Sequence, residues 1–211
     1  MNLYAINGFL RCGIIVALLS VAANAQRIFY SDLDSGPNTG GQNGKGAIVT
    51  IYGRGFGSTR GNSTVSVGGG AVDNYPLWSD TKIALQLGTA AQTGNIIVNV
   101  AGGSSSNGIP FTVRSGNIYF VATSGSDSNN GSYTSPWRTI TKAKSALAAG
   151  DIAYVMDGVS QTGMDDYNAS LAIASSGSSG RPKALVAYPG AKVTIGNTSG
   201  PEFGVRTPSI S

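Results

Sequence analysis

The residue types that most often carry catalysis are scarce in this chain of 211 residues. It contains no histidine, which excludes a Ser-His-Asp triad, a Cys-His pair and every imidazole metal site. Its single cysteine, Cys12, lies near the N-terminus, ahead of an apolar run. A general base would have to come from a carboxylate, Lys, Tyr or Arg. The sequence therefore predicts no catalytic residue in this chain.

Acidic residues are candidates for cation binding. Asp165 and Asp166 form the only adjacent acid pair and could hold a cation, although a solvated loop is the favoured interpretation. The run 127–131 (DSNNG) partly resembles a Ca²⁺ loop but lacks the third oxygen ligand before glycine and the distant Glu, so it is predicted to be a turn. Asp151, directly after Gly150, is also predicted to be a turn residue. We expect no metal and no cofactor in this chain.

Aromatic residues are the candidates for ligand contact, because aromatic faces stack on sugar rings. The sequence singles out Tyr75 and Trp78, together with Tyr52, as possible polysaccharide contacts. Trp78 ends the strand-like stretch 72–78, where packing into the core or along a strand edge is the alternative. A polysaccharide is thus one candidate partner.

Composition and charge indicate a β-protein with no nucleic-acid surface. The chain is 41% hydrophobic and only 11% charged, and its 31 glycines accompany stretches rich in Ser, Thr and Asn. This mixture favours many short strands joined by tight turns. The net charge is +4, and the basic residues are scattered singly instead of forming the patch that a nucleic acid would need.

Residues 1–25 have the pattern of a signal peptide. Arg11 supplies the positive charge, residues 13–19 the apolar run, and Ala23-Asn24-Ala25 the small-residue cleavage pattern before Gln26. The apolar run is shorter than the ~20 residues that span a bilayer. We expect cleavage after Ala25, no stable membrane span, and a secreted protein located in the periplasm, outside the cell or on its surface.

Residues 27–114 alternate between apolar segments and turn clusters and are predicted to form an antiparallel β-sandwich. The predicted strands are Ala47–Tyr52, Thr64–Val67, Ala71–Trp78, Lys82–Leu87, Asn95–Val100 and Ile109–Val113. Gly53 and Gly55 are expected to adopt positive φ in a tight turn, and Phe56 to fold back as a plug over the end of the sandwich.

The run 46–57 (GAIVTIYGRGFG) resembles the signature of IPT/TIG domains, a strand followed by a Gly-x-Gly-Phe-Gly turn. The resemblance continues, in order, through residues 65–69, 79–83, 94–100 and 106–113. It implies an immunoglobulin-like sandwich that serves as a spacer or a binding platform, without catalysis.

Residues 117–211 show a different pattern after the short polar joint 115–117. Strands are predicted at Ile118–Val121, Ile152–Met156, Ser170–Ala174, Ala184–Ala187 and Lys192–Ile195. A helix is predicted over 139–149, because Ile140, Ala143 and Leu147 form one apolar stripe. Gly150 stands at the position expected for its C-terminal cap.

This segment resembles the N-terminal cap of right-handed parallel β-helix proteins, especially secreted polysaccharide lyases. The residues that carry the resemblance are 119–127, 131–140, 149–155, 176–182 and 187–190, with a departure at 157–160. It implies an α-helix that covers the first rung. It also implies that the catalytic base and any Ca²⁺ of a full-length parent would lie on middle rungs. About two rungs are expected before residue 211, and residues 204–211 are expected to form neither a strand end nor a capping repeat, so the β-helix is expected to be truncated.

The predicted fold class is therefore mainly β: an immunoglobulin-like sandwich plus the start of a right-handed parallel β-helix with one capping α-helix. Two functions are compatible with it. One is the non-catalytic N-terminal portion of a secreted, carbohydrate-active β-helix protein, whose full-length parent could be a polysaccharide lyase. The other is a surface adhesion or interaction protein, with the sandwich as the binding module and the β-helix as its stalk.

Overall fold

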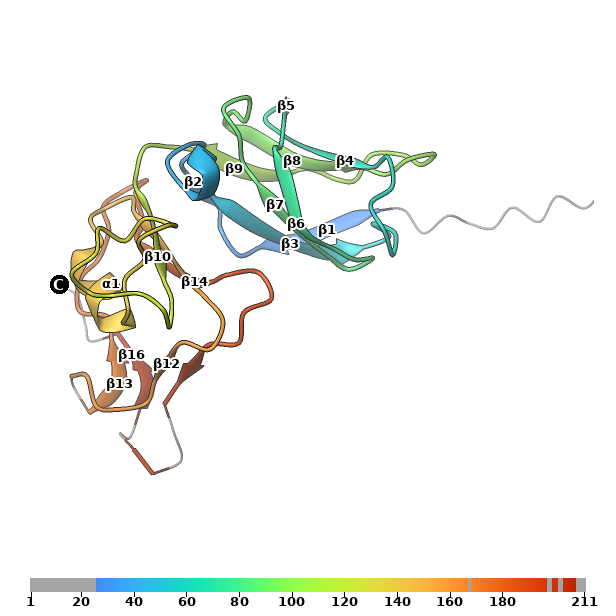
Figure 1. Ribbon diagram of the computed structural model, residues 1–211. Coiled ribbons are helices and arrows are strands. Elements are labelled where there is room, and N and C mark those ends of the chain that lie inside the picture. The colour runs from blue at the N-terminus through green and yellow to red at the C-terminus, as the bar shows by residue number, and fades with distance from the viewer. Residues whose placement is uncertain (1–25, 167, 197–198, 201–202, 208–211) are drawn as a thin grey trace, which may run out of the picture.

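The structure is a computed structural model that describes residues 26–166, 168–196, 199–200 and 203–207. The predicted signal peptide, residues 1–25, and its cleavage position at Ala25 lie outside the described residues. The described chain is mainly β, with several sheets and a single α-helix. Figure 1 shows a sandwich, in blue and green, adjoining a group of parallel strands and turns in yellow to red.

The first part of the chain contains two sheets that enclose a common core. The four-stranded sheet has the order β1-β3-β7-β6, with β1 at Arg27–Ser31, β3 at Ile48–Arg54, β6 at Asn74–Trp78 and β7 at Lys82–Gln86. The five-stranded sheet has the order β2-β9-β8-β4-β5, with β2 at Ser35–Gly36, β4 at Thr64–Val67, β5 at Gly70–Ala71, β8 at Gly94–Asn99 and β9 at Ile109–Val113. A short 3-10 turn, η1 (Gln42–Gly44), precedes β3.

Burial follows the two-residue period of a strand on β4 and β8, whereas β3 and β7 are buried at almost every position. Val49 and Ile51 on β3 point inward and are fully buried, as are Ile83 and Leu85 on β7. The predicted sandwich is thus confirmed, and β4 and β9 have the predicted bounds. Sequence reasoning did not predict β1 or β2.

The Gly-x-Gly-Phe-Gly turn is built differently from the prediction at one of its glycines. Gly55 has a positive φ of 74°, as expected, but Gly53 does not lie in the left-handed region. A Cβ atom on Gly53 would instead lie 2.1 Å from the Arg27 carbonyl oxygen and 2.4 Å from Cζ of Phe56. Gly53 is therefore required for close packing of β1 and of Phe56, which is fully buried as the predicted plug.

In the second part of the chain, the described strands pair with one another only in parallel. One sheet joins β10 (Ile118–Val121), β11 (Ile152–Val155) and β14 (Ala184–Ala187). Two further pairs join β12 (Ser160–Gln161) to β15 (Thr194–Ile195), and β13 (Ala169–Ala172) to β16 (Phe203–Arg206). The prediction that residues 204–211 form no strand end is wrong, because β16 ends at Arg206; residues 208–211 lie outside the described residues.

Helix α1 (Ile140–Ala146) is shorter than predicted. Thr139 caps its N-terminus, with Oγ1 accepting the N–H of Lys142 at 3.0 Å. Leu147 already has extended backbone angles, so Gly150, with a φ of 98°, belongs to the following turn and not to the helix cap. The predicted apolar stripe is confirmed, because Ile140, Ala143 and Leu147 are all buried.

No helix among the described residues has the length and apolar character needed to cross a membrane.

The sheet β10-β11-β14 is covered on both faces. Ile118, Phe120, Ile152 and Tyr154 pack into the same core as the sandwich residues. The alternate residues Val121, Ala153 and Val155 face the other way, into a second core that includes the apolar stripe of α1. The sandwich and the parallel strands therefore share one continuous core.

Polar contacts reinforce this junction at Tyr154. Its hydroxyl accepts the N–H of Ile48 at 2.7 Å and donates to the Ile48 carbonyl at 2.8 Å. Strand β1 pairs with β3 only as far as Ile51, so Ile48 lies beyond that pairing. Tyr154 thus satisfies backbone groups at the end of β3 that need a partner when buried.

The polar joint 115–117 is held in place by hydrogen bonds on both sides. Arg114 donates to the carbonyl of Gly150 and, at 3.0 Å, to Oγ of Ser35. The Asp151 carboxylate accepts the N–H of Asn117 at 2.8 Å and that of Ala148 at 2.9 Å. Asp151 is a buried turn residue that fixes the joint to the end of α1.

Candidate functional site

Tyr75 and Trp78, the predicted sugar contacts, are half-buried against the sandwich core. The Tyr75 hydroxyl accepts the N–H of Val65 at 2.8 Å, and the Trp78 indole N–H donates to the carbonyl oxygens of Phe56 and Gly57, each at 3.2 Å. The two rings pack edge to face, with centroids 5.5 Å apart. Their polar atoms are thus used inside the domain, and sugar contact at these two residues stays a prediction.

The most exposed aromatic rings of the sandwich lie on β1. Phe29 and Tyr30 are 55% and 58% exposed. The Tyr30 ring stacks on that of Tyr52, with centroids 4.7 Å apart and planes inclined by 15°. Because β1 is an edge strand, no neighbouring strand of this sheet covers the other face of the Tyr30 ring. A planar apolar surface is therefore held rigidly at the edge of the sheet.

A β-bulge in β1 creates this arrangement. The register shifts between Ile28, which pairs with Gly53, and Tyr30, which pairs with Tyr52. Residues two apart on a regular strand share a face, and the extra residue of a bulge breaks that rule. Ile28 can therefore point into the core, where it is 2% exposed, while Tyr30 points outward.

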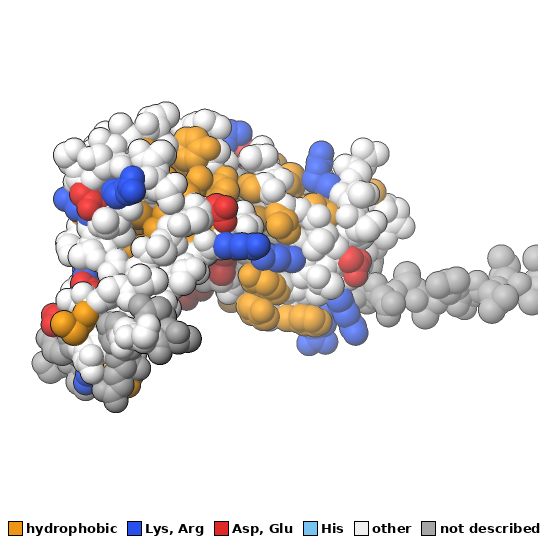
Figure 2. All heavy atoms as spheres, turned by 60° about the horizontal axis from the view of Figure 1, so that its bottom comes forward, with side chains coloured by type: hydrophobic (Ala, Val, Ile, Leu, Met, Phe, Trp, Pro, Cys, Tyr) orange, Lys and Arg blue, Asp and Glu red, His pale blue; other side chains and the backbone are white. Residues whose placement is uncertain are grey.

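Three cations share the outer face with the tyrosines. In the strand register, Arg27 on β1 lies opposite Arg54 on β3, and Lys82 on β7 lies opposite Tyr52 on β3. The side chains of opposite residues lie on the same face of the sheet. Nζ of Lys82 lies 5.3 Å from the centroid of the Tyr52 ring, in cation–π geometry. We call this surface the aromatic–basic face; it consists of Arg27, Tyr30, Tyr52, Arg54 and Lys82. Figure 2 shows exposed hydrophobic side chains beside Lys and Arg side chains near the start of the described chain.

The cations of this face form no ion pair with any carboxylate in the described part of the chain. Asp32 and Asp80, on the segments nearest to it, accept the backbone N–H groups of Thr50 and Gly57 at 2.7 and 3.0 Å. The face therefore combines exposed aromatic surface with positive charge that no described carboxylate pairs.

Asp165 does not lie in a solvated loop, contrary to the prediction. Its side chain is 7% exposed and forms an ion pair with Lys144, whose side chain is 18% exposed. The Asp165 carboxylate also accepts the N–H of Ala172 at 2.9 Å, and Nζ of Lys144 donates to the Ala172 carbonyl at 3.0 Å. The Asp165 carboxylate is thus fully engaged in structural contacts. Asp166 also has an interaction partner.

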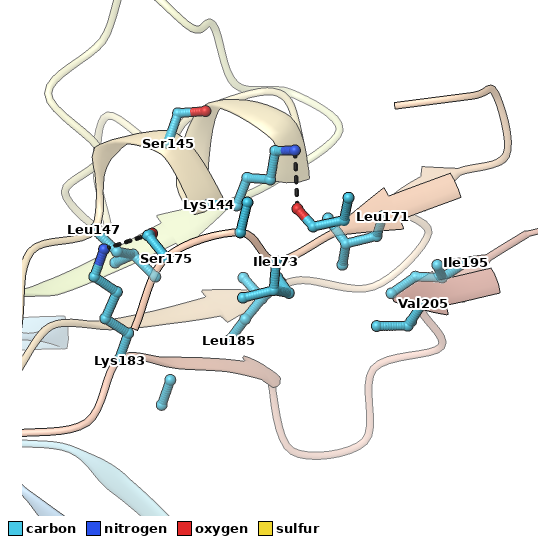
Figure 3. A pocket seen from close by; sticks show the side chains of 13 residues that line it. Lys144, Ser145, Leu147, Leu171, Ile173, Ser175, Lys183, Leu185, Ile195 and Val205 are labelled. Atoms are coloured by element: carbon cyan, nitrogen blue, oxygen red, sulfur yellow. Dashed lines mark hydrogen bonds between the residues drawn. The ribbon is translucent and has the colours of Figure 1, made fainter. Parts of the chain in front are cut away.

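A groove of about 520 Å³ opens beside this ion pair. In Figure 3 apolar side chains project into it while Lys144 and Lys183 stand at its rim. Nζ of Lys183 donates to Oγ of Ser175 at 2.9 Å. The apolar lining is Leu147, Leu171, Ile173, Leu185, Ile195 and Val205. The groove continues the core behind α1, and its two cations are already hydrogen-bonded.

The loop 127–131 is an ordered turn. The Asp127 carboxylate accepts the N–H groups of Arg138 and Thr139 at 2.9 and 3.0 Å and the Thr139 hydroxyl at 2.8 Å. Slight burial opposes ionisation, but the hydrogen bonds from Thr139 and Arg138 outweigh it and lower the pKa of Asp127 below its usual value. Among the described residues no group of three or more acidic, Cys or His side chains could hold a metal ion.

The family model of the IPT/TIG domain matches residues 34–113. This stretch of the chain is an IPT/TIG domain. It includes Tyr52, Arg54 and Lys82, whereas Arg27 and Tyr30 on β1 precede the matched residues. The edge strand thus adds two of the five residues of the aromatic–basic face to the domain.

No curated protein sequence matches the chain. Among solved structures, the chain is similar to XylC in complex with xylose, at 34% identity over 37% of this chain and 11% of that chain, with a TM-score of 0.31. A rhamnogalacturonan lyase matches at 21% identity over 44% of this chain and 27% of that chain, with a TM-score of 0.31. A gamma-CGTase from alkalophilic Bacillus clarkii matches at 26% identity over 50% and 15%, with a TM-score of 0.34. The chain thus spans at most 27% of these proteins, and TM-scores this low describe local likeness only.

Proposed function

We propose that this chain is a non-catalytic, carbohydrate-binding portion of a secreted, carbohydrate-active protein. The observation that carries the proposal is the exposed, stacked pair Tyr30–Tyr52 at the edge of the sandwich. A large aromatic ring that is exposed to solvent on a folded domain indicates a possible ligand-binding surface. The stack fixes the ring beforehand, so little side-chain entropy is lost when the apolar face of a sugar packs on it.

We further propose that the parallel strands are the start of a right-handed parallel β-helix. The support is a nearly constant spacing between paired strands. Paired residues are 34 apart for Ile118 and Ile152 and 32 apart for Ile152 and Ala184. They are 34 apart for Ser160 and Thr194 and for Ala169 and Phe203. A fixed period of this size is the mark of a solenoid.

In this arrangement the sandwich has a fixed position on the solenoid. The shared core and the Tyr154 hydrogen bonds oppose hinge motion between the two parts. The role of the sandwich is to hold a bound polysaccharide at a fixed distance and orientation relative to the solenoid. Domains joined by a small polar contact move relative to one another by default, whereas a large apolar contact prevents this.

The proposal of a non-catalytic role rests on chemistry. The chain has no histidine, and the least exposed Lys–Asp pair, Lys144 and Asp165, is engaged in structural hydrogen bonds. Acid–base cleavage needs a base within reach of a substrate proton. Neither partner of this pair is free for that task.

Binding of the chain to a panel of immobilised plant and bacterial polysaccharides tests the proposed function. Tyr30→Ala is compared with Tyr133→Ala, an exposed tyrosine on the second part of the chain. We expect the wild-type chain and the Tyr133 variant to bind at least one polysaccharide and the Tyr30 variant to lose at least tenfold in affinity. Equal binding by both variants, or no binding to any polysaccharide, would refute the proposal.

A further inference from the structure

The cations of the aromatic–basic face restrict the class of polysaccharide that it fits. Arg27 and Arg54 lie directly opposite each other on neighbouring strands. Like charges in that position repel and lower the stability of a sheet. Both arginines are exposed, and no described carboxylate pairs with either. An anion placed between them would remove the repulsion and gain two charge-assisted interactions.

The tyrosines and the cations are arranged as parts of one site. Because of the bulge, Arg27 and Tyr30 lie opposite Arg54 and Tyr52, which are two residues apart on β3 and therefore about 7 Å apart along the strand. Lys82 lies on the other side of Tyr52, two strands from Tyr30. A single sugar ring cannot reach all of these groups, whereas a short stretch of a polymer can. The site is a flat, extended surface suited to a chain of sugars.

We infer that the aromatic–basic face binds a polyuronate, a polysaccharide that carries a carboxylate on each sugar ring. The inference rests on the proposed function and names its ligand class. A sugar ring packs on the open face of Tyr30 while the carboxylates of neighbouring residues reach Arg27 and Arg54. Arginine suits this role, because its planar fork can bind a carboxylate through two parallel hydrogen bonds.

The test compares polygalacturonate with its fully methyl-esterified form, which has the same backbone without the charge. Binding of the chain to each polymer is measured by affinity electrophoresis at low and at high salt. We expect tight binding of polygalacturonate that weakens with salt, and weak binding of the ester. Arg27→Gln and Arg54→Gln should each reduce polygalacturonate binding about tenfold, which corresponds to about 1.4 kcal/mol, because each removes one charge-assisted interaction.

The matched control is the double variant Arg60→Gln/Lys183→Gln, compared with Arg27→Gln/Arg54→Gln. Both remove two positive charges, but Arg60 and Lys183 lie away from the face, at the Tyr75 ring and at the groove. The control should bind polygalacturonate like the wild-type chain. Thermal unfolding of each variant establishes that it is folded.

The outcomes separate the two proposals. If both polymers bind equally and only Tyr30→Ala reduces binding, the carbohydrate-binding function stands and the polyuronate inference is wrong. Equal losses in the two double variants would mean that net charge, not this face, governs binding, which also overturns the inference. A sulfated glycan that binds more tightly than polygalacturonate would contradict the choice of carboxylate. If no polysaccharide binds, both proposals fail.

Discussion

Replacing Tyr154 by Phe removes one oxygen atom from the centre of the molecule. The ring is fully buried, and its hydroxyl makes two hydrogen bonds to the backbone of Ile48. The Phe variant keeps the packing of the ring against Phe120 and Tyr188. The substitution therefore tests the polar junction between the sandwich and the parallel strands and leaves the apolar junction intact.

The expected loss of stability follows from the two backbone groups of Ile48 that lose their hydrogen-bond partner. Without the hydroxyl, both the N–H and the carbonyl of Ile48 lose a buried partner. Each buried backbone group without a partner costs about 1–3 kcal/mol, so the loss of both partners should lower the free energy of unfolding by about 2–6 kcal/mol. The control is Tyr188→Phe, whose hydroxyl donates one half-exposed hydrogen bond to Oε1 of Gln42. That variant should lose only about 0.5–1.5 kcal/mol.

Urea denaturation of the chain from Gln26 measures both variants. The two tryptophans lie in different parts of the molecule, since Trp78 is on β6 of the sandwich and Trp137 packs behind β10 in the second core. Substituting either by Phe leaves the other as a local fluorescence probe. Because the two parts share a core, we expect both probes to report the same transition. A loss below about 0.5 kcal/mol in Tyr154→Phe, or two well-separated transitions in the wild-type chain, would refute this reasoning.

Three further predictions concern the buried Tyr154 hydroxyl, the buried Lys144–Asp165 ion pair and the signal peptide. Burial is the largest cause that raises the pKa of Tyr154, so its contribution to stability is present below the pKa of an unfolded tyrosine, about 10, and is lost above it. Wild-type stability should fall between pH 10 and 12, and Tyr154→Phe should reduce that slope by up to ~1.4 kcal/mol per pH unit; an unchanged slope would contradict the buried hydroxyl. Asp165→Ala should cost about 3 kcal/mol because it leaves Lys144 unpaired, whereas Asp73→Ala, in the half-exposed pair with Lys45, should cost under about 1 kcal/mol; equal losses would mean that the Asp165 pair is not buried in solution. N-terminal sequencing of exported protein should begin at Gln26, and a retained leader in a membrane fraction would overturn the proposed secretion.

Strands β4 and β9 could be predicted because their burial alternates with a two-residue period, whereas β3 and β7 are buried on both faces. Thr64–Val67 and Ile109–Val113 have the predicted bounds for this reason. Strand β1 was missed because it follows the predicted signal peptide directly and because its bulge interrupts the alternation. Its composition was a usable signal, since the run RIFYS is rich in aromatic and β-branched residues.

The site could not be predicted from residue types alone. Nothing in the local sequence distinguishes Tyr75, Trp78 and Tyr30 as possible ligand contacts. Strand register decides which of these rings is buried and which is exposed to solvent. The bulge at Phe29 decides this for Tyr30. Tyr52 was among the candidates, but its partners Tyr30 and Lys82 come from strands on either side of it. Such cross-strand neighbours depend on pairings between distant segments.

The contact between the sandwich and the parallel strands could also not be predicted from local sequence patterns. The strand Ile152–Val155 reads as a continuous apolar run, which indicates burial on both faces but not what covers them. In the structure one cover is the sandwich, through Tyr154 and Ile48. The pairing of Lys144 with Asp165 spans 21 residues and has no sequence pattern of its own.

The most direct measurement of the central claim is a map of chemical-shift changes in the isotope-labelled chain on titration with an oligogalacturonate. The account predicts that the backbone amides of Arg27, Tyr30, Tyr52, Arg54 and Lys82 shift, while those of Leu171 and Ile173 in the groove stay unchanged. Saturable shifts centred on the groove or on Tyr75 and Trp78, with the aromatic–basic face unmoved, would contradict it.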